Sequence, residues 1–377
     1  MERHTQRTWA EIDLAAIAGN ISNIKKYVGE KSKVMAVVKA DAYGHGAVQT
    51  AKAMLENGAD CLGVAFIDEA EQLRAAGITA PVLILGYTAD YDAARVVEAE
   101  VTPTLFSLGS AKAFSECAVG ANKKVKIHIK LDTGMNRIGF SCTKESVEEI
   151  VKISKLENIE IEGIFTHFSC ADEKGREYTD VQAKKFIDFV SELEKRGVKI
   201  PVKHACNSAG VVRFPEYYFD MVRPGIILYG MPPSADVDIS PLNLKHAMTI
   251  KSVVTRIHTA DIGARVSYGG TFVEGEKKVL ATIPVGYADG YSRLLSDRAV
   301  MSVKGKFAKV VGRICMDQCM IDVTNVNNIK VEDEVIVAGG AVDAPCSYHS
   351  LAELEGTISY ELFCLTGKRV PRIYIND

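Results

Sequence analysis

Eight short apolar runs rich in valine and isoleucine alternate with segments of helical periodicity over the first two thirds of the chain. This rhythm is typical of βα units around a parallel sheet. We expect strands at 34–38, 61–65, 82–85, 102–106, 125–131, 161–166, 202–205 and 221–228, the last interrupted by Pro224 and Gly225. We expect helices at 47–57, 67–76, 89–99, 110–118, 144–156, 179–196 and 208–213. No G-x-G-x-x-G turn opens the first helix, so the eight units predict a closed (β/α)8 barrel of the TIM type rather than an open sheet.

The pattern changes after Tyr229. Residues 231–241 contain three prolines and little periodicity, which is typical of a linker. Most of the remaining sequence alternates, as at 253–257, 279–283, 308–314 and 331–337, and alternation predicts strands. We therefore predict a barrel domain over residues 12–238. A smaller, mainly β C-terminal domain covers 239–377, with residues 1–11 as an additional strand.

Composition excludes several classes of protein. The 377 residues are 47% hydrophobic and carry a formal net charge of -3, which leaves no cationic surplus for nucleic acid or an anionic membrane. No run reaches the ~20 apolar residues that a membrane-spanning helix needs, and the N-terminus lacks a signal peptide. The nine cysteines are scattered and never spaced C-x-x-C, so we expect neither disulfides nor a metal site. These features predict a soluble cytoplasmic protein.

Chemically capable side chains follow the expected strands, and the carboxyl ends of barrel strands form the active-site face. Lys39 directly follows the first strand, where burial favours its neutral, nucleophilic amine. A lysine whose stem lies along the barrel rim is the alternative. The other candidates on this face are Lys130, Arg137, His167, Asp172, His204, Asn207, Ser208 and Arg223.

The last two strand ends predict a phosphate site. Loops after strands seven and eight of a barrel hold phosphate with backbone amides and a hydroxyl, and Ser208 with the amides of Gly225 and Ile226 fits this role. An activated lysine beside a phosphate site suggests pyridoxal phosphate held as a Schiff base. Taken singly, a histidine such as His167 or His204 is more often a hydrogen-bonded structural residue.

Nine sequence blocks resemble the alanine racemase family, in order and from end to end. They are AVVKADAYGHG, HIKLDTGMNRIGF, THFSCAD, HACNSAG, MVRPGIILYG, VSYGGTF, IPVGYADGYSR, GRICMDQCMIDVT and TISYEL. The resemblance implies a pyridoxal-phosphate enzyme that interconverts L-alanine and D-alanine and supplies D-alanine for peptidoglycan of the cell wall. A serine or broad-specificity racemase of the same fold is the alternative.

The resemblance also assigns roles to residues. Lys39 carries the cofactor and is one of two bases at Cα, and Tyr268 is the base on the opposite face. Two bases are needed because inversion removes a proton from one face and returns it to the other. Arg223 faces the pyridine nitrogen and is held by His167, with His204 nearby.

The remaining roles concern binding. Arg137 contacts the cofactor and the substrate carboxylate, and Lys130 is carboxylated in many relatives. Met316 contacts substrate; without the resemblance it would be read as a core methionine. The phosphate is assigned to Tyr43, Ser208, Gly225, Ile226 and Tyr360. Supporting positions are Asn207, Cys315 and Asp317, and an entry corridor is assigned to Asp172, Tyr287 and Arg293.

The resemblance implies a homodimer with shared active sites, in which Tyr268 reaches the neighbouring subunit's barrel. Two other interpretations compete. A barrel decarboxylase lacks support because its glycine-rich phosphate loop is not found, and a cofactor carrier would not need the second domain.

Overall fold

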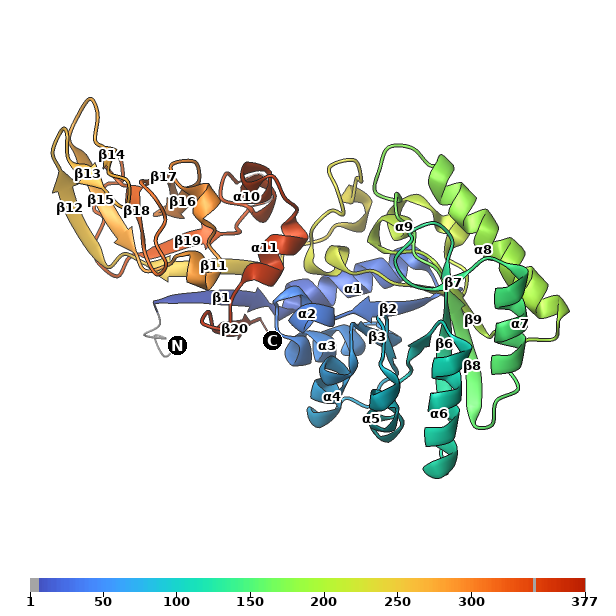
Figure 1. Cartoon of the computed structure of the whole chain (residues 1–377). Coiled ribbons are helices and arrows are strands. Elements are labelled where there is room, and N and C mark those ends of the chain that lie inside the picture. Colours follow the sequence, from blue (N-terminus) through green and yellow to red (C-terminus); the bar gives the residue numbers. More distant parts are fainter. Residues whose placement is uncertain (1–6, 342–343, 377) are drawn as a thin grey trace. The chain divides into compact units, whose positions relative to one another are not determined.

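The computed structural model describes residues 7–341 and 344–376. Contacts divide the chain into two compact units (Figure 1). The barrel unit contains Ile17–Ala42 and Gly46–Lys245. The β unit contains the described residues through Ala16, the short segment Tyr43–His45, and the described residues from His246 onward.

The barrel unit is built on eight parallel strands in the order β4-β3-β2-β10-β9-β8-β6-β5. The strands are β2 (Lys33–Val37), β3 (Cys61–Val64), β4 (Val82–Ile84), β5 (Thr104–Leu105), β6 (Val125–Asp132), β8 (Ile159–Phe165), β9 (Val202–His204) and β10 (Met221–Val222), while β7 (Phe140–Ser141) pairs with β6. β3 and β4 are buried throughout, as expected of strands covered on both faces. A parallel bridge between Leu83 and Thr102 joins the two ends of the order.

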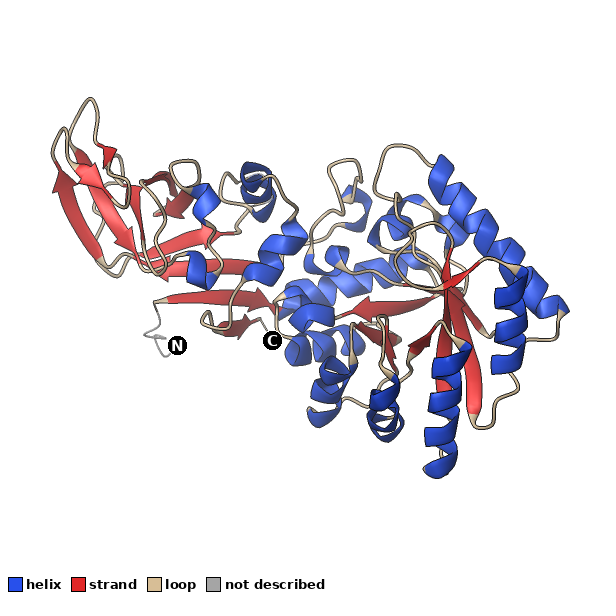
Figure 2. Ribbon diagram, viewed as in Figure 1, coloured by secondary structure: helices blue, strands red, loops and turns tan. Residues whose placement is uncertain are grey.

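Helices surround these strands (Figure 2). They are α2 (Lys39–Tyr43), α3 (Ala47–Glu56), α4 (Ile67–Ala75), α5 (Ala93–Ala99), α6 (Leu108–Gly120), α7 (Lys144–Ile153), α8 (Glu177–Lys195) and α9 (Ser208–Arg213). Short 3-10 turns are η1 (Asp90–Asp92), η2 (Pro215–Tyr217), η3 (Ile226–Tyr229) and η4 (Ser240–Leu242). Helix α1 (Leu14–Val28) begins in the β unit and continues into the barrel unit.

One predicted strand is wrong in extent. The eighth ends at Val222 rather than Leu228, and residues 226–229 form η3. Pro224 has no N–H to donate to a ladder, which explains why the strand cannot continue.

The β unit contains one nine-stranded sheet and one hairpin. The sheet runs β12-β15-β18-β17-β16-β19-β11-β1-β20 and includes β1 (Thr8–Asp13), β11 (Met248–Val253), β12 (Arg256–Ala260), β15 (Lys278–Ile283), β16 (Val300–Val303), β17 (Lys306–Val311), β18 (Cys319–Asp322), β19 (Glu334–Ala338) and β20 (Arg372–Ile375). The hairpin is β13 (Arg265–Val266) with β14 (Thr271–Phe272). The other elements are η5 (Tyr287–Asp289), η6 (Arg293–Leu295), α10 (Tyr348–Glu355) and α11 (Ser359–Leu365).

An additional strand was expected over residues 1–11; residues 1–6 lie outside the described part of the chain, and β1 covers Thr8–Asp13 in the sheet of the β unit. β1 pairs antiparallel with β11 and parallel with β20, and alternate residues of β1 are buried. The strand expected at 253–257 is wrong, because β11 ends at Val253 and β12 begins at Arg256. A barrel followed by a mainly β unit confirms the predicted fold class.

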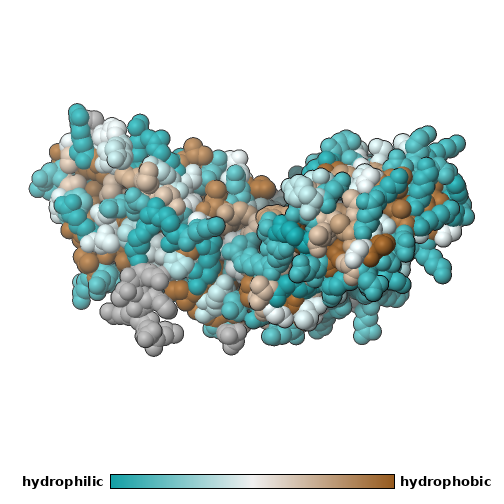
Figure 3. Space-filling model, turned by 60° about the horizontal axis from the view of Figure 1, so that its bottom comes forward, coloured by the Kyte–Doolittle hydropathy of each residue, from teal (hydrophilic) through white to brown (hydrophobic). Residues whose placement is uncertain are grey.

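The surface is mixed in character. Hydrophilic residues cover most of the face shown in Figure 3, and hydrophobic residues form small separate patches on it. Within residues 7–341 and 344–376, none of the helices combines the length and the apolar character that crossing a membrane requires. All nine cysteines have free thiols.

Candidate active site

Lys39 lies two residues beyond the end of β2 and opens a left-handed turn. Ala40, Asp41, Ala42 and Tyr43 all have φ between 52° and 54°. L-residues rarely adopt this conformation, and consecutive ones cost roughly 1–2 kcal/mol each. Backbone strain of this kind gathers at functional sites. The composition of the segment gives no signal of this turn, and the sequence did not predict it.

Hydrogen bonds from the barrel unit stabilise the turn. The Asp41 carboxylate accepts from the Ala47 amide at 2.7 Å, at the start of α3. The Ala40 amide donates to Glu69 Oε1 at 2.7 Å. The other carboxylate oxygen of Glu69 accepts from Ala65 N at 2.7 Å. Glu69, which sequence reasoning did not single out, therefore ties the residue after Lys39 to the end of the neighbouring strand.

Arg223 is buried beyond the end of β10, and the ends of β8 and β9 bind its guanidinium. It donates to the carbonyls of Thr166 at 2.8 Å and Ala205 at 2.9 Å. Its Nη1 lies 2.8 Å from His204 Nδ1, whereas its Nη2 lies 3.4 Å from His167 Nδ1. Both histidines therefore lie within hydrogen-bond distance of the guanidinium, and His204 is the closer of the two.

The Nε–H of Arg223 donates to none of the described residues. Arginine carries five N–H donors, and the hydrogen bonds that Arg223 makes with the described residues use its Nη1 and Nη2. Burial lowers the pKa of Arg223 to about 10. With this pKa the guanidinium stays protonated near pH 7, so its Nε can act only as a donor.

Lys130 is almost completely buried at the end of β6. Its Nζ donates to the Leu131 carbonyl at 2.5 Å and lies 5.4 Å from the centre of the Phe165 ring. Burial, together with the nearby charge of Arg223, lowers the pKa of Lys130 to about 7. Much of this amine is therefore neutral at physiological pH, which is the form that reacts with electrophiles.

His167 is surrounded by cations. Burial lowers its pKa well below the usual value, and Arg223, Arg137, Lys130 and Lys39 all act in the same direction. Arg137 itself is exposed, in a loop after β6 that Asp132 shapes by accepting from the amides of Gly134 and Asn136. These four basic side chains form an electropositive centre suited to an anionic ligand, to which Lys130 adds charge only in its protonated fraction.

Gln182 is a residue of this region that sequence reasoning missed. It is fully buried on α8 and donates to the His167 carbonyl at 3.1 Å, while its oxygen accepts from the Ser169 amide at 2.9 Å. A glutamine at a buried helical position is the one available signal.

Ser208 and Gly225 come together as expected. The Ser208 hydroxyl accepts from the Gly225 amide at 2.8 Å, immediately before η3 begins at Ile226. Asn207 caps α9 by accepting from Gly210 N at 2.9 Å and donates to the Phe168 carbonyl. The first amides of a helical turn have no acceptor within that turn, so this corner offers amides and a hydroxyl to an anion. Asp172 lies on a separate loop, where its carbonyl accepts from Ser234.

In the β unit, Tyr268 follows a residue in the left-handed region and is 71% exposed. That residue, Ser267, donates to the Arg313 carbonyl and lies 3.4 Å from Cys315 Sγ. Cys315 precedes Met316, which is 52% exposed. The Tyr268 and Met316 segments are therefore neighbours, and both present apolar side chains outward.

A second contact joins Met316 to the turn that begins at Tyr287. The Tyr287 amide donates to the Cys315 carbonyl at 3.1 Å, and the Ala288 amide donates to the Met316 carbonyl at 3.0 Å. A Cβ at Gly286 would overlap both carbonyl oxygens, so only glycine allows this approach. Tyr287, Met316 and Tyr268 thus belong to one surface.

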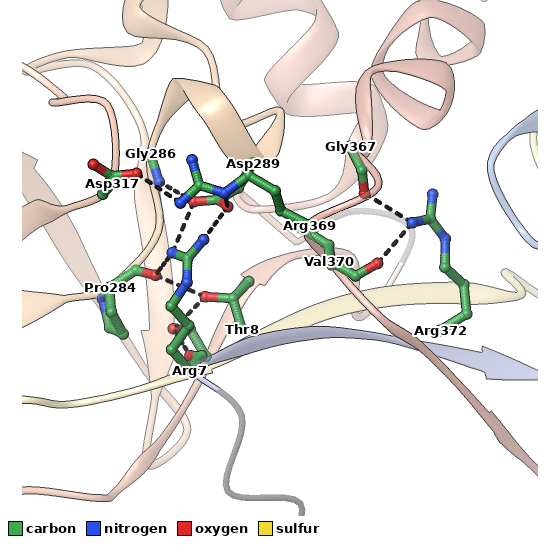
Figure 4. A network of polar contacts seen from close by, with 11 residues as sticks. Arg7, Thr8, Pro284, Gly286, Asp289, Asp317, Gly367, Arg369, Val370 and Arg372 are labelled. Carbon is green, nitrogen blue, oxygen red and sulfur yellow. Dashed lines mark hydrogen bonds and ion pairs between the residues drawn. The ribbon is translucent and has the colours of Figure 1, made fainter.

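An ionic network supports this surface (Figure 4). The buried Asp289 ends η5 and forms an ion pair with Arg7. Arg369 approaches Asp289 at 3.5 Å and binds Asp317 at 2.6 Å. Asp317 therefore anchors the Met316 segment through Arg369. Arg293 is exposed at the start of η6.

Tyr43 and Tyr360 also meet within the β unit, with ring centres 6.1 Å apart. Burial raises the pKa of the Tyr43 hydroxyl, so that hydroxyl keeps its proton and can act as a donor.

The fold and site define a two-unit barrel enzyme with a cationic centre at the strand ends. Residues 12–233 match the family described as "Alanine racemase, N-terminal domain", and residues 247–374 match "Alanine racemase, C-terminal domain". The chain belongs to the alanine racemase family, so the predictions of family and of a racemase class of enzyme are confirmed.

Individual relatives agree with the family match. Alanine racemase 1 of Clostridium acetobutylicum is 49% identical over 100% of this chain and 97% of its own length. An alanine racemase of Methanococcus maripaludis is 49% identical over 98% of each chain. A solved alanine racemase of Clostridium difficile 630 is 43% identical, with a TM-score of 0.96 over 99% of this chain and 97% of that one.

Proposed function

We propose that this chain interconverts L-alanine and D-alanine with pyridoxal phosphate, by a two-base mechanism that uses Lys39 and Tyr268. The observation that carries the proposal is the cationic centre of Lys39, Lys130, Arg137 and Arg223 around His167, within a chain of this family. The product would supply D-alanine for peptidoglycan in the cytoplasm. A serine or broad-specificity racemase is the alternative, and a panel of L-amino acids assayed for optical inversion decides between them.

The donor set fits the cofactor. The Ser208 hydroxyl and the Ile226 amide would hold the phosphate, with the Gly225 amide positioning that hydroxyl, and the hydroxyls of Tyr43 and Tyr360 would donate to it. The unused donor of Arg223 fits the ring nitrogen. When bound, pyridoxal phosphate withdraws electrons from the Cα–H bond of an amino acid and makes that hydrogen acidic.

Side chains of the protein would carry out the proton transfers. Lys39 would hold the cofactor, give way to the substrate amine, and then take or return the proton at Cα from one face. Tyr268 would do the same from the opposite face. Arg223 can only donate and does not give up its proton near pH 7, so it would leave the ring nitrogen unprotonated and limit the side reactions that a stronger electron sink favours.

Binding and access complete the assignment. Arg137 would bind the substrate carboxylate, and Met316 would contact the substrate. The neutral amine of Lys130 can add carbon dioxide and release a proton. The carbamate formed would be an anion that orients Arg137. Asn207, Cys315 and Asp317 would be supporting positions of the site. Asp172, Tyr287 and Arg293 would line the entry corridor.

We infer that two copies form a homodimer in which the β unit of one chain covers the site of the other. The exposure of Tyr268, Tyr287 and Met316, all on one surface of the β unit, supports this arrangement. Residues 12–238 would then form the cofactor-binding domain, and the β-rich domain, over 239–377 with strand 1–11, would supply Tyr268.

Two experiments test the proposal. Borohydride reduction followed by peptide mapping should place a pyridoxyl group on Lys39, and labelling elsewhere would contradict the assignment. Mixing Lys39→Ala with Tyr268→Phe under subunit exchange should restore about a quarter of wild-type activity, because half the dimers are hybrids with one intact site. No recovery despite exchange would mean that each chain builds its own site.

A further inference from the structure

A chain of polar contacts leads from Arg223 through His204 of β9 and His128 of β6 to the carboxylate of Glu162 on β8, the strand between them. Arg223 Nη1 lies 2.8 Å from His204 Nδ1, and His204 Nε2 lies 2.8 Å from His128 Nδ1. His128 Nε2 faces Glu162 Oε2 at 3.4 Å. We call these four residues the Arg223 relay. Both imidazoles are buried, and the Phe165 ring stacks on His204 at 4.7 Å with an interplanar angle of 9°.

The direction of every hydrogen in the relay follows from Arg223. Arginine has donors only, so His204 Nδ1 must accept. Burial lowers the pKa values of both His204 and His128, so each is neutral and carries one N–H. The hydrogen of His204 is then on Nε2 and points to His128 Nδ1, and the hydrogen of His128 is on Nε2 and points to Glu162.

Glu162 is suited to be the last acceptor of the Arg223 relay. It offers acceptors only, and the His128 contact is the leading reason why its pKa falls to about 2. The following residue is Gly163, which pairs with His128 in the sheet at an irregularity of register. A Cβ there would come within 2.5–2.8 Å of the His128 ring atoms. The dipeptide Glu162–Gly163 therefore supplies both the acceptor and the space for the imidazole.

We propose that Glu162 and His128 are positioning residues which, through His204, hold Arg223 as an oriented donor to the cofactor ring. This inference rests on the proposed function, which puts the ring nitrogen against Arg223. If the hydrogens of the relay reversed, His204 Nδ1–H would face an Arg223 N–H. Two donors would then meet in a buried site, and Arg223 would have to move.

Nitrogen-15 NMR of histidine- and arginine-labelled protein without cofactor tests the relay directly. Glu162→Leu removes the acceptor at its end. We expect the nitrogen-15 chemical shifts of His128 to move towards those of a mixture of tautomers. The chemical shifts of the His204 nitrogens and of the Arg223 side chain should change with them. Changes confined to His128, with His204 and Arg223 as in wild type, would overturn the inference.

Two matched controls separate the relay from the surface charge. Lys126 forms an ion pair with Glu162 at 2.8 Å, so Lys126→Met removes that pair and leaves the relay intact. Glu160 is exposed two residues earlier on the same strand, so Glu160→Gln changes the charge without touching the relay. Neither control should move the His204 signals. Should Glu162→Leu fold poorly, Glu162→Gln keeps the size with a neutral acceptor, and the same signals should move less.

Kinetics of the holoenzyme supply the second measurement. Partners that orient the ligands of a metal site typically contribute tenfold or more to activity, and we expect a similar scale for residues that orient Arg223. We expect Glu162→Leu to lower kcat for alanine about tenfold with KM within about twofold, and both controls to stay near wild type. A kcat equal to that of Lys126→Met would overturn the inference. If the wild type does not racemise alanine, the proposed function fails, and the NMR measurement still decides the relay.

Discussion

Replacing Lys130 with methionine should change how the stability of the barrel unit depends on pH. The folded amine has a pKa of about 7, because the side chain is 3% exposed, whereas the ordinary value is 10.5. Between these values the unfolded chain holds a proton that the folded chain has lost, so the free energy of unfolding rises with pH. Below pH 7 both states are protonated and the burial cost is fully present.

The expected magnitude follows from the size of the shift. Within this window the free energy of unfolding rises by at most about 1.4 kcal/mol for each pH unit. From pH 7 to pH 9 the wild type should therefore gain roughly 2 kcal/mol relative to Lys130→Met. Methionine is of similar length and uncharged, so the variant loses this slope and keeps most of the packing.

Urea unfolding in buffer free of carbon dioxide measures this difference. Far-UV circular dichroism is the suitable signal because Trp9, the sole tryptophan, lies on β1 of the other unit. Lys126→Met is the control on the same strand. The pKa of Lys126 is raised by Glu162, so it keeps its proton throughout this range. Parallel pH profiles for wild type and Lys130→Met would refute the reasoning. Added bicarbonate should stabilise the wild type alone if Lys130 is carboxylated.

Three further changes have expected outcomes. Ser208→Ala removes a hydroxyl that a buried amide donates to, and should weaken cofactor binding about tenfold, measured by fluorescence titration; unchanged affinity would exclude Ser208 from the phosphate site. Gly286→Ala inserts a Cβ against the carbonyls of Cys315 and Met316, and should lower the melting temperature by several degrees, a result that an unshifted calorimetric transition would contradict. Tyr268→Phe alters an exposed side chain, and should abolish racemisation while leaving the melting temperature within about 1 °C; substantial residual activity would exclude Tyr268 as a base.

Local pattern was sufficient to find the strands and most of the strand-end residues. Burial on both faces demands continuous apolar runs, so the end of each run indicates where the next side chain meets solvent. Lys39, His204 and Ser208 were predicted in this way and lie close after β2, at the end of β9 and at the start of α9. The eighth strand was overextended because η3 has the same apolar composition as a strand.

Contacts between residues on different strands could not be predicted from the apolar pattern of any one strand. His128 and His204 are 76 positions apart and meet only because β6 and β9 both pair with β8. The same pairing puts Gly163 beside His128, where its missing side chain makes room. Nothing in a single strand reveals the register of its neighbour.

The sequence by itself determined the class of fold, through the period of its apolar residues, and through its motifs the family to which the chain belongs. The tertiary structure alone decided the left-handed turn after Lys39, the near-neutral pKa of Lys130, and the direction of the hydrogens from Arg223 to Glu162. The reason is physical: apolar periodicity is a property of neighbouring residues, whereas desolvation and hydrogen-bond direction depend on groups that closure of the barrel brings together.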